Sequence, residues 1–155
     1  MPKYGIKVAE VMTRNPVKIM LDEGIINAAK LMSKYSVGTL AVVDAENRIR
    51  GILSEADIVR KIVANGLGPE LKVKDVMTKR PVCVKPDDDI GDVVKKIVKY
   101  GHKVFPVQQD GKLVGYITYK DILAVQPGIV DVLQEALLND LREMRLKLKL
   151  IRRMR

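Results

Sequence analysis

Two stretches of this chain each occur twice. Residues 8–17 read VAEVMTRNPV, and residues 73–82, which lie 65 positions later, read VKDVMTKRPV. Residues 51–57 read GILSEAD and return at 115–121 as GYITYKD. A repeat of this length indicates one supersecondary unit used twice, and such units bury their open faces against each other. We therefore expect any site in one half to have a counterpart in the other.

The composition is that of a globular domain. The chain has 155 residues, of which 47% are hydrophobic, enough for one sizeable core. No apolar run reaches the ~20 residues of a membrane helix, and the polar start does not resemble a secretory signal. We therefore expect a cytoplasmic protein without a membrane span. The chain has one Cys and one His, so we expect neither an internal disulfide nor a metal site.

Hydrophobic spacing predicts the order β-α-β-β-α in each half, which makes the fold class α/β (α+β) with two pseudo-symmetric units packed as one module. The first half is expected to have a helical turn at 8–12, strands at 17–20, 39–43 and 49–53, and helices at 25–35 and 54–64. The second is expected to have strands at 82–84, 104–108 and 113–118, and helices at 90–100 and 118–125. These elements divide the chain into repeat 1 (1–68), repeat 2 (69–126) and a basic C-terminal helix (127–155).

The paired units resemble tandem CBS domains, the arrangement called a Bateman module. Each unit starts with Val-Met-Thr-x-x-Pro-Val and closes with Gly-x-x-Ser/Thr-x-x-Asp, in order and in register, and the resemblance covers residues 8–125. It implies clefts between the units that bind adenosine nucleotides or adenosyl compounds. AMP is the first candidate, with ATP, ADP and S-adenosylmethionine as others. It also implies a disc-like homodimer.

The closing motif has two interpretations. By the resemblance, Asp57 and Asp121 accept hydrogen bonds from the two ribose hydroxyls, and Ser54 and Thr118 lie near the phosphate. A carboxylate only accepts hydrogen bonds, which suits a vicinal diol, and free N–H groups at a helix start suit a phosphate. The alternative is a capping box, because a Ser or Thr with an acid three residues later is a common start of a helix.

Other residues join the two clefts by resemblance. The opening segments are expected to contact the adenine, and the loops before the central strands to line the same clefts. His102 and Lys103 offer two adjacent basic groups to a phosphate, although His102 also fits an exposed loop. Val37 and Gly38 replace this pair in repeat 1, which removes cationic partners there. This departure favours phosphate binding at the second site, or occupancy of one site only. The further predicted ligand residues are Thr13, Pro16, Val17, Thr78, Arg80, Pro81, Val82, Gly101, Val104, Gly38 and Thr39.

We find no set of residues that would build an active site. The chain has no Ser-His-Asp set, no Cys-His pair and no Gly-rich phosphate loop. The acids at 87–89 open a helix, and their simplest role is to complement its dipole. The sequence thus predicts a non-catalytic, energy-sensing regulatory protein that needs no cofactor, binds an adenine nucleotide and signals to an effector protein.

The C-terminal segment carries most of the net charge. Residues 139–155 hold seven Lys or Arg and two acids, which is +5 of the total +9. Val130, Leu137, Met144 and Ile151 recur every seven residues, with Leu141 and Leu148 between them and Gln134 interrupting the second row. This helix is expected to pair with another subunit or to pack on the module. The alternatives are binding of nucleic acid or lipid, with the repeats as a dimerisation block, and a solvated helix end.

Overall fold

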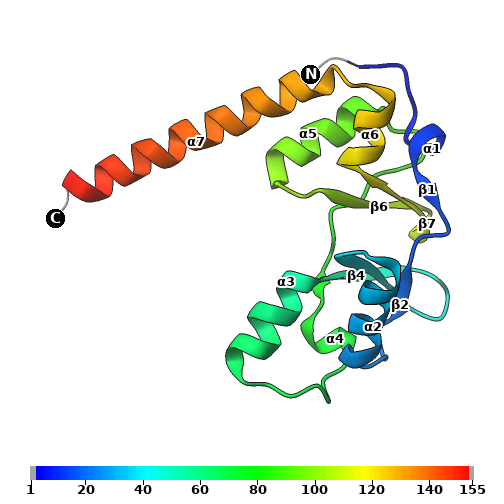
Figure 1. Ribbon diagram of the computed structural model, residues 1–155. Coiled ribbons are helices and arrows are strands. Elements are labelled where there is room, and N and C mark those ends of the chain that lie inside the picture. The colour runs from blue at the N-terminus through cyan, green and yellow to red at the C-terminus, as the bar shows by residue number, and fades with distance from the viewer. Residues whose placement is uncertain (1–2, 154–155) are drawn as a thin grey trace.

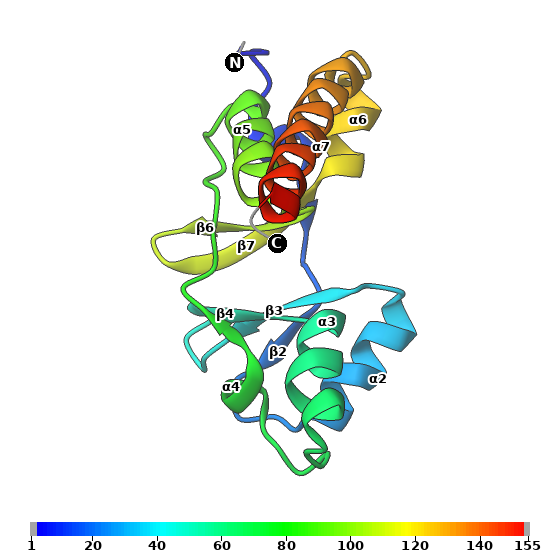
Figure 2. The same cartoon turned by 90° about the vertical axis from the view of Figure 1, so that its left-hand side faces the viewer.

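Two sheets face each other in the middle of the molecule, and helices cover their outer faces (Figures 1 and 2). The computed structural model describes residues 3–153. Within the last helix it does not describe the side chains at 136, 137, 140, 141, 143–145, 147, 148 and 151. The predicted fold class, a mixed α and β module of two similar halves followed by a C-terminal helix, is confirmed.

The elements follow the predicted order closely. The first half contains α1 (Val8–Val11), β1 (Thr13–Arg14), β2 (Lys18–Met20), α2 (Ile25–Tyr35), β3 (Thr39–Val43), β4 (Ile49–Ser54) and α3 (Glu55–Asp57), which continues as a π-helical turn (Ile58–Ile62) and a 3-10 turn (Val63–Asn65). The second contains α4 (Val73–Val76), β5 (Thr78–Lys79), α5 (Ile90–Tyr100), β6 (Val104–Gln109), β7 (Lys112–Thr118) and α6 (Tyr119–Val125). The C-terminal helix is α7 (Ile129–Arg153).

The opening segment of each repeat crosses to the sheet of the other repeat. One sheet has the order β2-β3-β4-β5, so β5 of repeat 2 pairs with β4 of repeat 1. The other has the order β1-β7-β6, so β1 of repeat 1 pairs with β7 of repeat 2. The short helices cross with their strands, since Val8 of α1 lies in the core of repeat 2 and Val73 of α4 in that of repeat 1. The two halves are therefore interlocked.

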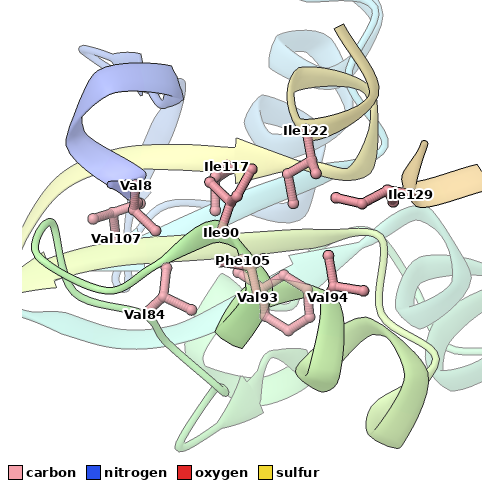
Figure 3. Packing of buried hydrophobic residues seen from close by; sticks show 10 residues of the cluster. All are labelled: Val8, Val84, Ile90, Val93, Val94, Phe105, Val107, Ile117, Ile122 and Ile129. Atoms are coloured by element: carbon pink, nitrogen blue, oxygen red, sulfur yellow. The ribbon is translucent and has the colours of Figure 1, made fainter. Parts of the chain in front are cut away.

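Each half has its own hydrophobic core between a sheet and its helices, and a third cluster lies between the sheets. The core of repeat 2 surrounds Phe105 and extends to Ile129 at the start of α7 (Figure 3). The third cluster, built on Ala41, Val43, Leu113 and Tyr116, joins the inner faces of β3 and β7. Burial of these apolar side chains supplies the main driving force for holding the halves together.

Two predicted elements differ from the observed ones. The predicted strand at 82–84 is reduced to a single bridge between Val84 and Val107. Pro81 and Pro86 bracket this segment, and neither has an N–H group for a ladder. The predicted helix at 54–64 is a short α-helix followed by π-helical and 3-10 turns.

The first turns of α7 pack on the module, and the rest of the helix projects beyond α5 (Figure 1). Ile129 is fully buried, and Val132 and Leu133 pack against the same core. Farther along, Leu146 and Leu150 are about 60% exposed. The predicted seam residues Leu137, Leu141, Met144, Leu148 and Ile151 lie outside the described side chains. No helix within residues 3–153 combines the length and the apolar character needed to cross a membrane.

Candidate functional site

The opening segment of each repeat makes a sharp turn between the two sheets. Asn15 and Arg80, which precede Pro16 and Pro81, have φ values of 53° and 52°. Proline disfavours the right-handed helical region for the residue before it, and here that residue takes the left-handed region. The turn ends β1 on one sheet and directs the chain into β2 on the other. It therefore brings residues 13–17 to the junction of the repeats.

Both closing motifs form capping boxes. The Asp57 Oδ2 atom accepts hydrogen bonds from the Ser54 N–H at 2.9 Å and the Ser54 hydroxyl at 3.0 Å. The Asp121 Oδ2 atom accepts the same two bonds from Thr118, at 2.8 and 2.9 Å. In return, each hydroxyl accepts from the backbone N–H of its aspartate. The capping interpretation therefore accounts for one oxygen of each carboxylate, and only the other oxygen is available for a different role.

The second oxygen distinguishes the two repeats. The Lys61 Nζ atom lies 2.8 Å from the Asp57 Oδ1 atom in an ion pair. Burial acts to raise the pKa of Asp57, but hydrogen bonds from Lys61 and Ser54 outweigh it and hold that pKa below its ordinary value. For the Asp121 Oδ1 atom, no described group of the chain donates a hydrogen bond. Asp121 therefore keeps an acceptor that Asp57 has already used.

A cleft of about 470 Å³ lies where the opening segment of repeat 1 meets the closing motif of repeat 2. Four segments form its walls, at 13–17, 36–39, 103–104 and 116–120, and Thr118 precedes the first residue of α6. The cleft is lined by Thr13, Asn15, Pro16, Val17, Ser36, Val37, Gly38, Thr39, Lys103, Val104, Tyr116, Thr118, Tyr119 and Lys120. Its described lining includes two lysines and no carboxylate, so the cleft is suited to an anionic ligand with an apolar portion.

The structure brings eight of the predicted ligand residues to this cleft: Thr13, Pro16, Val17, Gly38, Thr39, Lys103, Val104 and Thr118. Asp121 is not among the residues that line the cleft, but its Oδ2 atom accepts a hydrogen bond from the hydroxyl of Thr118, which does line it. Asn15 lies within the opening segment 13–17 that was expected to contact the adenine, whereas sequence reasoning did not select Tyr116, Tyr119 and Lys120. Tyr119 and Lys120 lie between Thr118 and Asp121 in the closing motif, and this position in the sequence could have indicated that they lie near the same cleft.

The remaining predicted residues are placed elsewhere. Ser54 and Thr78 take the equivalent positions on the opposite side of the pseudo-symmetric pair, because Thr78 pairs with Ile52 as Thr13 pairs with Tyr116. Pro81 and Val82 follow Thr78 in the second opening segment. Gly101 caps α5 with a φ of 68°.

His102 and Arg80 are not among the residues that line the cleft. His102 is exposed, and its ring stacks on Tyr100 with 5.9 Å between centroids. Arg80 lines a separate, open hollow of about 680 Å³, which also holds Asp22, Asp44 and Arg50. Those carboxylates are paired within the chain, Asp44 with Arg50 and Asp22 with Lys74. This hollow therefore combines charges of both signs and is less suited to an anion than the cleft.

Comparison with known proteins identifies the fold family. A family model described as CBS domain matches residues 8–64 and, a second time, residues 73–128. The chain belongs to the CBS-domain family. The predicted resemblance to a tandem CBS pair is thereby confirmed. CBS pairs are regulatory modules and usually carry no catalysis themselves.

Individual relatives agree with this assignment. An uncharacterized protein of Methanopyrus kandleri is 31% identical over 133 residues, which are 84% of this chain and 68% of the relative. The CBS-domain pair of protein MJ0100, solved in complex with 5′-methylthioadenosine and S-adenosyl-L-methionine, is 25% identical with a TM-score of 0.71, and the match covers 82% of this chain and 98% of that one. CBSX2, solved in complex with AMP, is 24% identical with a TM-score of 0.69, over 81% of this chain and 98% of that one.

Proposed function

We propose that this protein is a regulatory module that binds an adenine nucleotide, with AMP as the first candidate, in the cleft between its CBS repeats. The observation that carries the proposal is the cleft lined by Thr13 and Thr118, where two lysines contribute positive charge. Asp121, hydrogen-bonded to Thr118, has one carboxylate oxygen to which no described group donates. Two CBS-pair structures similar to this one were solved with adenosine compounds, one with AMP and one with S-adenosylmethionine and methylthioadenosine.

The chemistry of the cleft matches the three parts of a nucleotide. Val17, Val37 and Val104 offer apolar contacts to an adenine ring. Asp121 offers a carboxylate oxygen to the ribose diol, since its other oxygen is held by the capping box. Lys103 and Lys120 supply positive charge for the phosphate.

A matched pair of variants separates ribose recognition from helix capping. Asp121→Ala and Asp57→Ala each remove the same capping interactions, so each is expected to cost about 1 kcal/mol of stability. Only Asp121→Ala removes a carboxylate beside the open cleft. Isothermal titration calorimetry with AMP, ATP and S-adenosylmethionine is expected to show binding to the wild type and to Asp57→Ala, and at least tenfold weaker binding to Asp121→Ala.

Two outcomes would contradict the proposal. The first is no heat of binding with any of the three ligands at millimolar concentration. The second is equal loss of affinity in the two variants, because a loss caused by capping alone would be shared. Thermal unfolding of both variants provides the control, since Asp57→Ala, which also loses the ion pair with Lys61, should be destabilised at least as much as Asp121→Ala.

We further propose that occupancy of the cleft is read by another polypeptide, and that the module forms a homodimer. A ligand shifts an arrangement only if it binds two arrangements with different affinities. Sedimentation velocity with and without AMP tests the homodimer and the ligand-dependent rearrangement that such a readout requires. A dimer changes the sedimentation coefficient, and a rearrangement on binding AMP changes it again. A monomer at all concentrations tested would refute the dimer.

The projecting half of α7 favours a second candidate function, binding to an anionic partner such as nucleic acid. Arg142, Lys149, Arg152 and Arg153 are all exposed on this half. The test is a chain that ends after Gln134, because this truncation keeps Ile129 and its core contacts. Loss of RNA or DNA retention with unchanged nucleotide affinity would support this function, and no retention by the full chain would exclude it.

A further inference from the structure

Each closing motif, together with the opening segment of the other repeat that lies beside it, forms one half-site of the module. Lys61 closes the half-site that contains Asp57. Its Nζ atom pairs with the Asp57 Oδ1 atom at 2.8 Å and donates a hydrogen bond to the Val76 carbonyl oxygen, also at 2.8 Å. The same ammonium lies 3.5 Å from the Thr78 hydroxyl. Lys61 thus connects the closing motif of repeat 1 to the opening segment of repeat 2. The equivalent space in the other half-site is open.

The equivalent position in repeat 2 has no cation. The closing motifs align with Asp57 on Asp121, so Lys61 aligns with Val125, which is 44% exposed at the end of α6. Thr13, the equivalent of Thr78, lines the open cleft together with Thr118. The backbone differs as well, because Lys61 lies in a π-helical turn, whereas α6 is α-helical up to Val125. The bridging cation of the Asp57 half-site therefore has no equivalent at Val125 in the open one.

The neighbouring residues reinforce this asymmetry. In the open cleft, Tyr119 and Lys120 follow Thr118. In repeat 1 the aligned residues are Glu55 and Ala56, so a lysine is lost and a carboxylate is gained. A phosphate near Ser54 would therefore meet a negative charge instead of a lysine.

We propose that Lys61 is an internal substitute for ligand, which blocks the Asp57 half-site so that each chain binds one adenine nucleotide. This inference rests on the proposed function and adds its stoichiometry. The ammonium uses the carboxylate oxygen that a ribose diol would need, and it holds the two elements between which a ribose would have to enter. The Asp121 half-site is left as the nucleotide site of the module.

Exchanging the two positions tests the proposal. Lys61→Met removes the ammonium and keeps the length of the side chain, and it is expected to add a second binding event for adenosine, which has no phosphate to meet Glu55. Val125→Lys places an ammonium four residues after Asp121, within reach on the same helix face, and is expected to weaken AMP binding at least tenfold. Val125→Gln and Lys95→Met are the matched controls. The first keeps length without charge, and the second breaks a surface pair with Asp92 away from both half-sites.

Calorimetric stoichiometry with AMP and adenosine, together with the melting temperature of each variant, gives a decisive reading. One site in the wild type, two for adenosine in Lys61→Met, and weak AMP binding in Val125→Lys alone support the proposal. Two sites in the wild type, or unchanged AMP affinity in Val125→Lys, overturn it while the proposed function stands. Absence of binding in the wild type overturns the proposed function itself.

Discussion

Two glycines control how closely the opening segments approach the opposite sheets. Gly115 on β7 pairs with Arg14 on β1, and Gly51 on β4 pairs with Lys79 on β5. A Cβ atom on Gly115 would lie 2.8 Å from the Thr13 carbonyl oxygen and 2.8 Å from the Met12 sulfur. A Cβ atom on Gly51 would lie 2.7 Å from the Thr78 carbonyl oxygen. Backbone oxygens at these distances cannot be avoided by a side-chain rotation.

Gly115→Ala is therefore expected to force β1 away from β7. Overpacking of this kind costs about 1–3 kcal/mol. For a chain of 155 residues this corresponds to a drop in melting temperature of roughly 2–12 °C. The displaced segment includes Thr13, which lines the open cleft, so the affinity for AMP should fall as well.

Gly51→Ala is the matched control. It introduces the same clash on the other side of the module, at β5, where Lys61 already bridges the half-site. Differential scanning calorimetry should show similar destabilisation in both variants, and titration with AMP should show weaker binding in Gly115→Ala alone. A melting temperature of Gly115→Ala within 1 °C of the wild type would refute the close-approach argument.

Three further predictions concern buried or titrating groups. The Tyr116 hydroxyl is buried without a hydrogen-bond partner among the described groups, although the Ala41 backbone lies nearby. Tyr116→Phe should therefore raise the unfolding free energy, measured by urea titration, by up to about 1 kcal/mol. A loss of stability would mean that the hydroxyl bonds to Ala41. Burial acts to raise the pKa of Asp89, but backbone N–H groups of Tyr4, Gly91 and Gly5 outweigh it and keep that pKa below 3.8. The stability that Asp89 contributes is therefore present above its unfolded pKa and is lost as the pH falls through its lower folded pKa. Asp89→Asn should destabilise the protein at pH 7, and this destabilisation should shrink as the pH is lowered below about 4, whereas a destabilisation independent of pH would contradict this. Burial raises the pKa of Cys83 to about 11, so its alkylation by iodoacetamide at pH 8 should be much slower in the folded protein than in urea, and equal rates would show that the thiol is accessible.

Much of the local structure could be predicted from the sequence because its signals are short-range. The helices at 25–35 and 90–100 and the strand at 39–43 have the predicted bounds. Each is long enough for its hydrophobic period to identify it, and each ends at a turn residue such as Ser36 or Gly101. The capping boxes at 54–57 and 118–121 were likewise visible as a Ser or Thr followed three residues later by an acid.

The two crossing strands were not visible in the sequence. β1 and β5 have two residues each, too few to show an alternating pattern. They exist because Gly115 and Gly51 allow a backbone from the other repeat to approach, which is a long-range property. No local signal indicates that the opening segment of repeat 1 meets the closing motif of repeat 2. The site residues could therefore be predicted, but not which of them share a cleft.

The sequence by itself determined that the chain is a duplicated β-α-β-β-α unit with an acidic closing motif in each half, because periodicity, turn residues and repeats are encoded along the chain. The tertiary structure decided which opening segment meets which closing motif. It also decided that Lys61 pairs with the Asp57 carboxylate, while one oxygen of Asp121 has no donor among the described groups. Those contacts join residues such as Lys61 with Val76 and Thr13 with Tyr116, which come together only when the two repeats interlock. The energies of these contacts depend on how the two repeats pack, and no local sequence pattern predicts that packing.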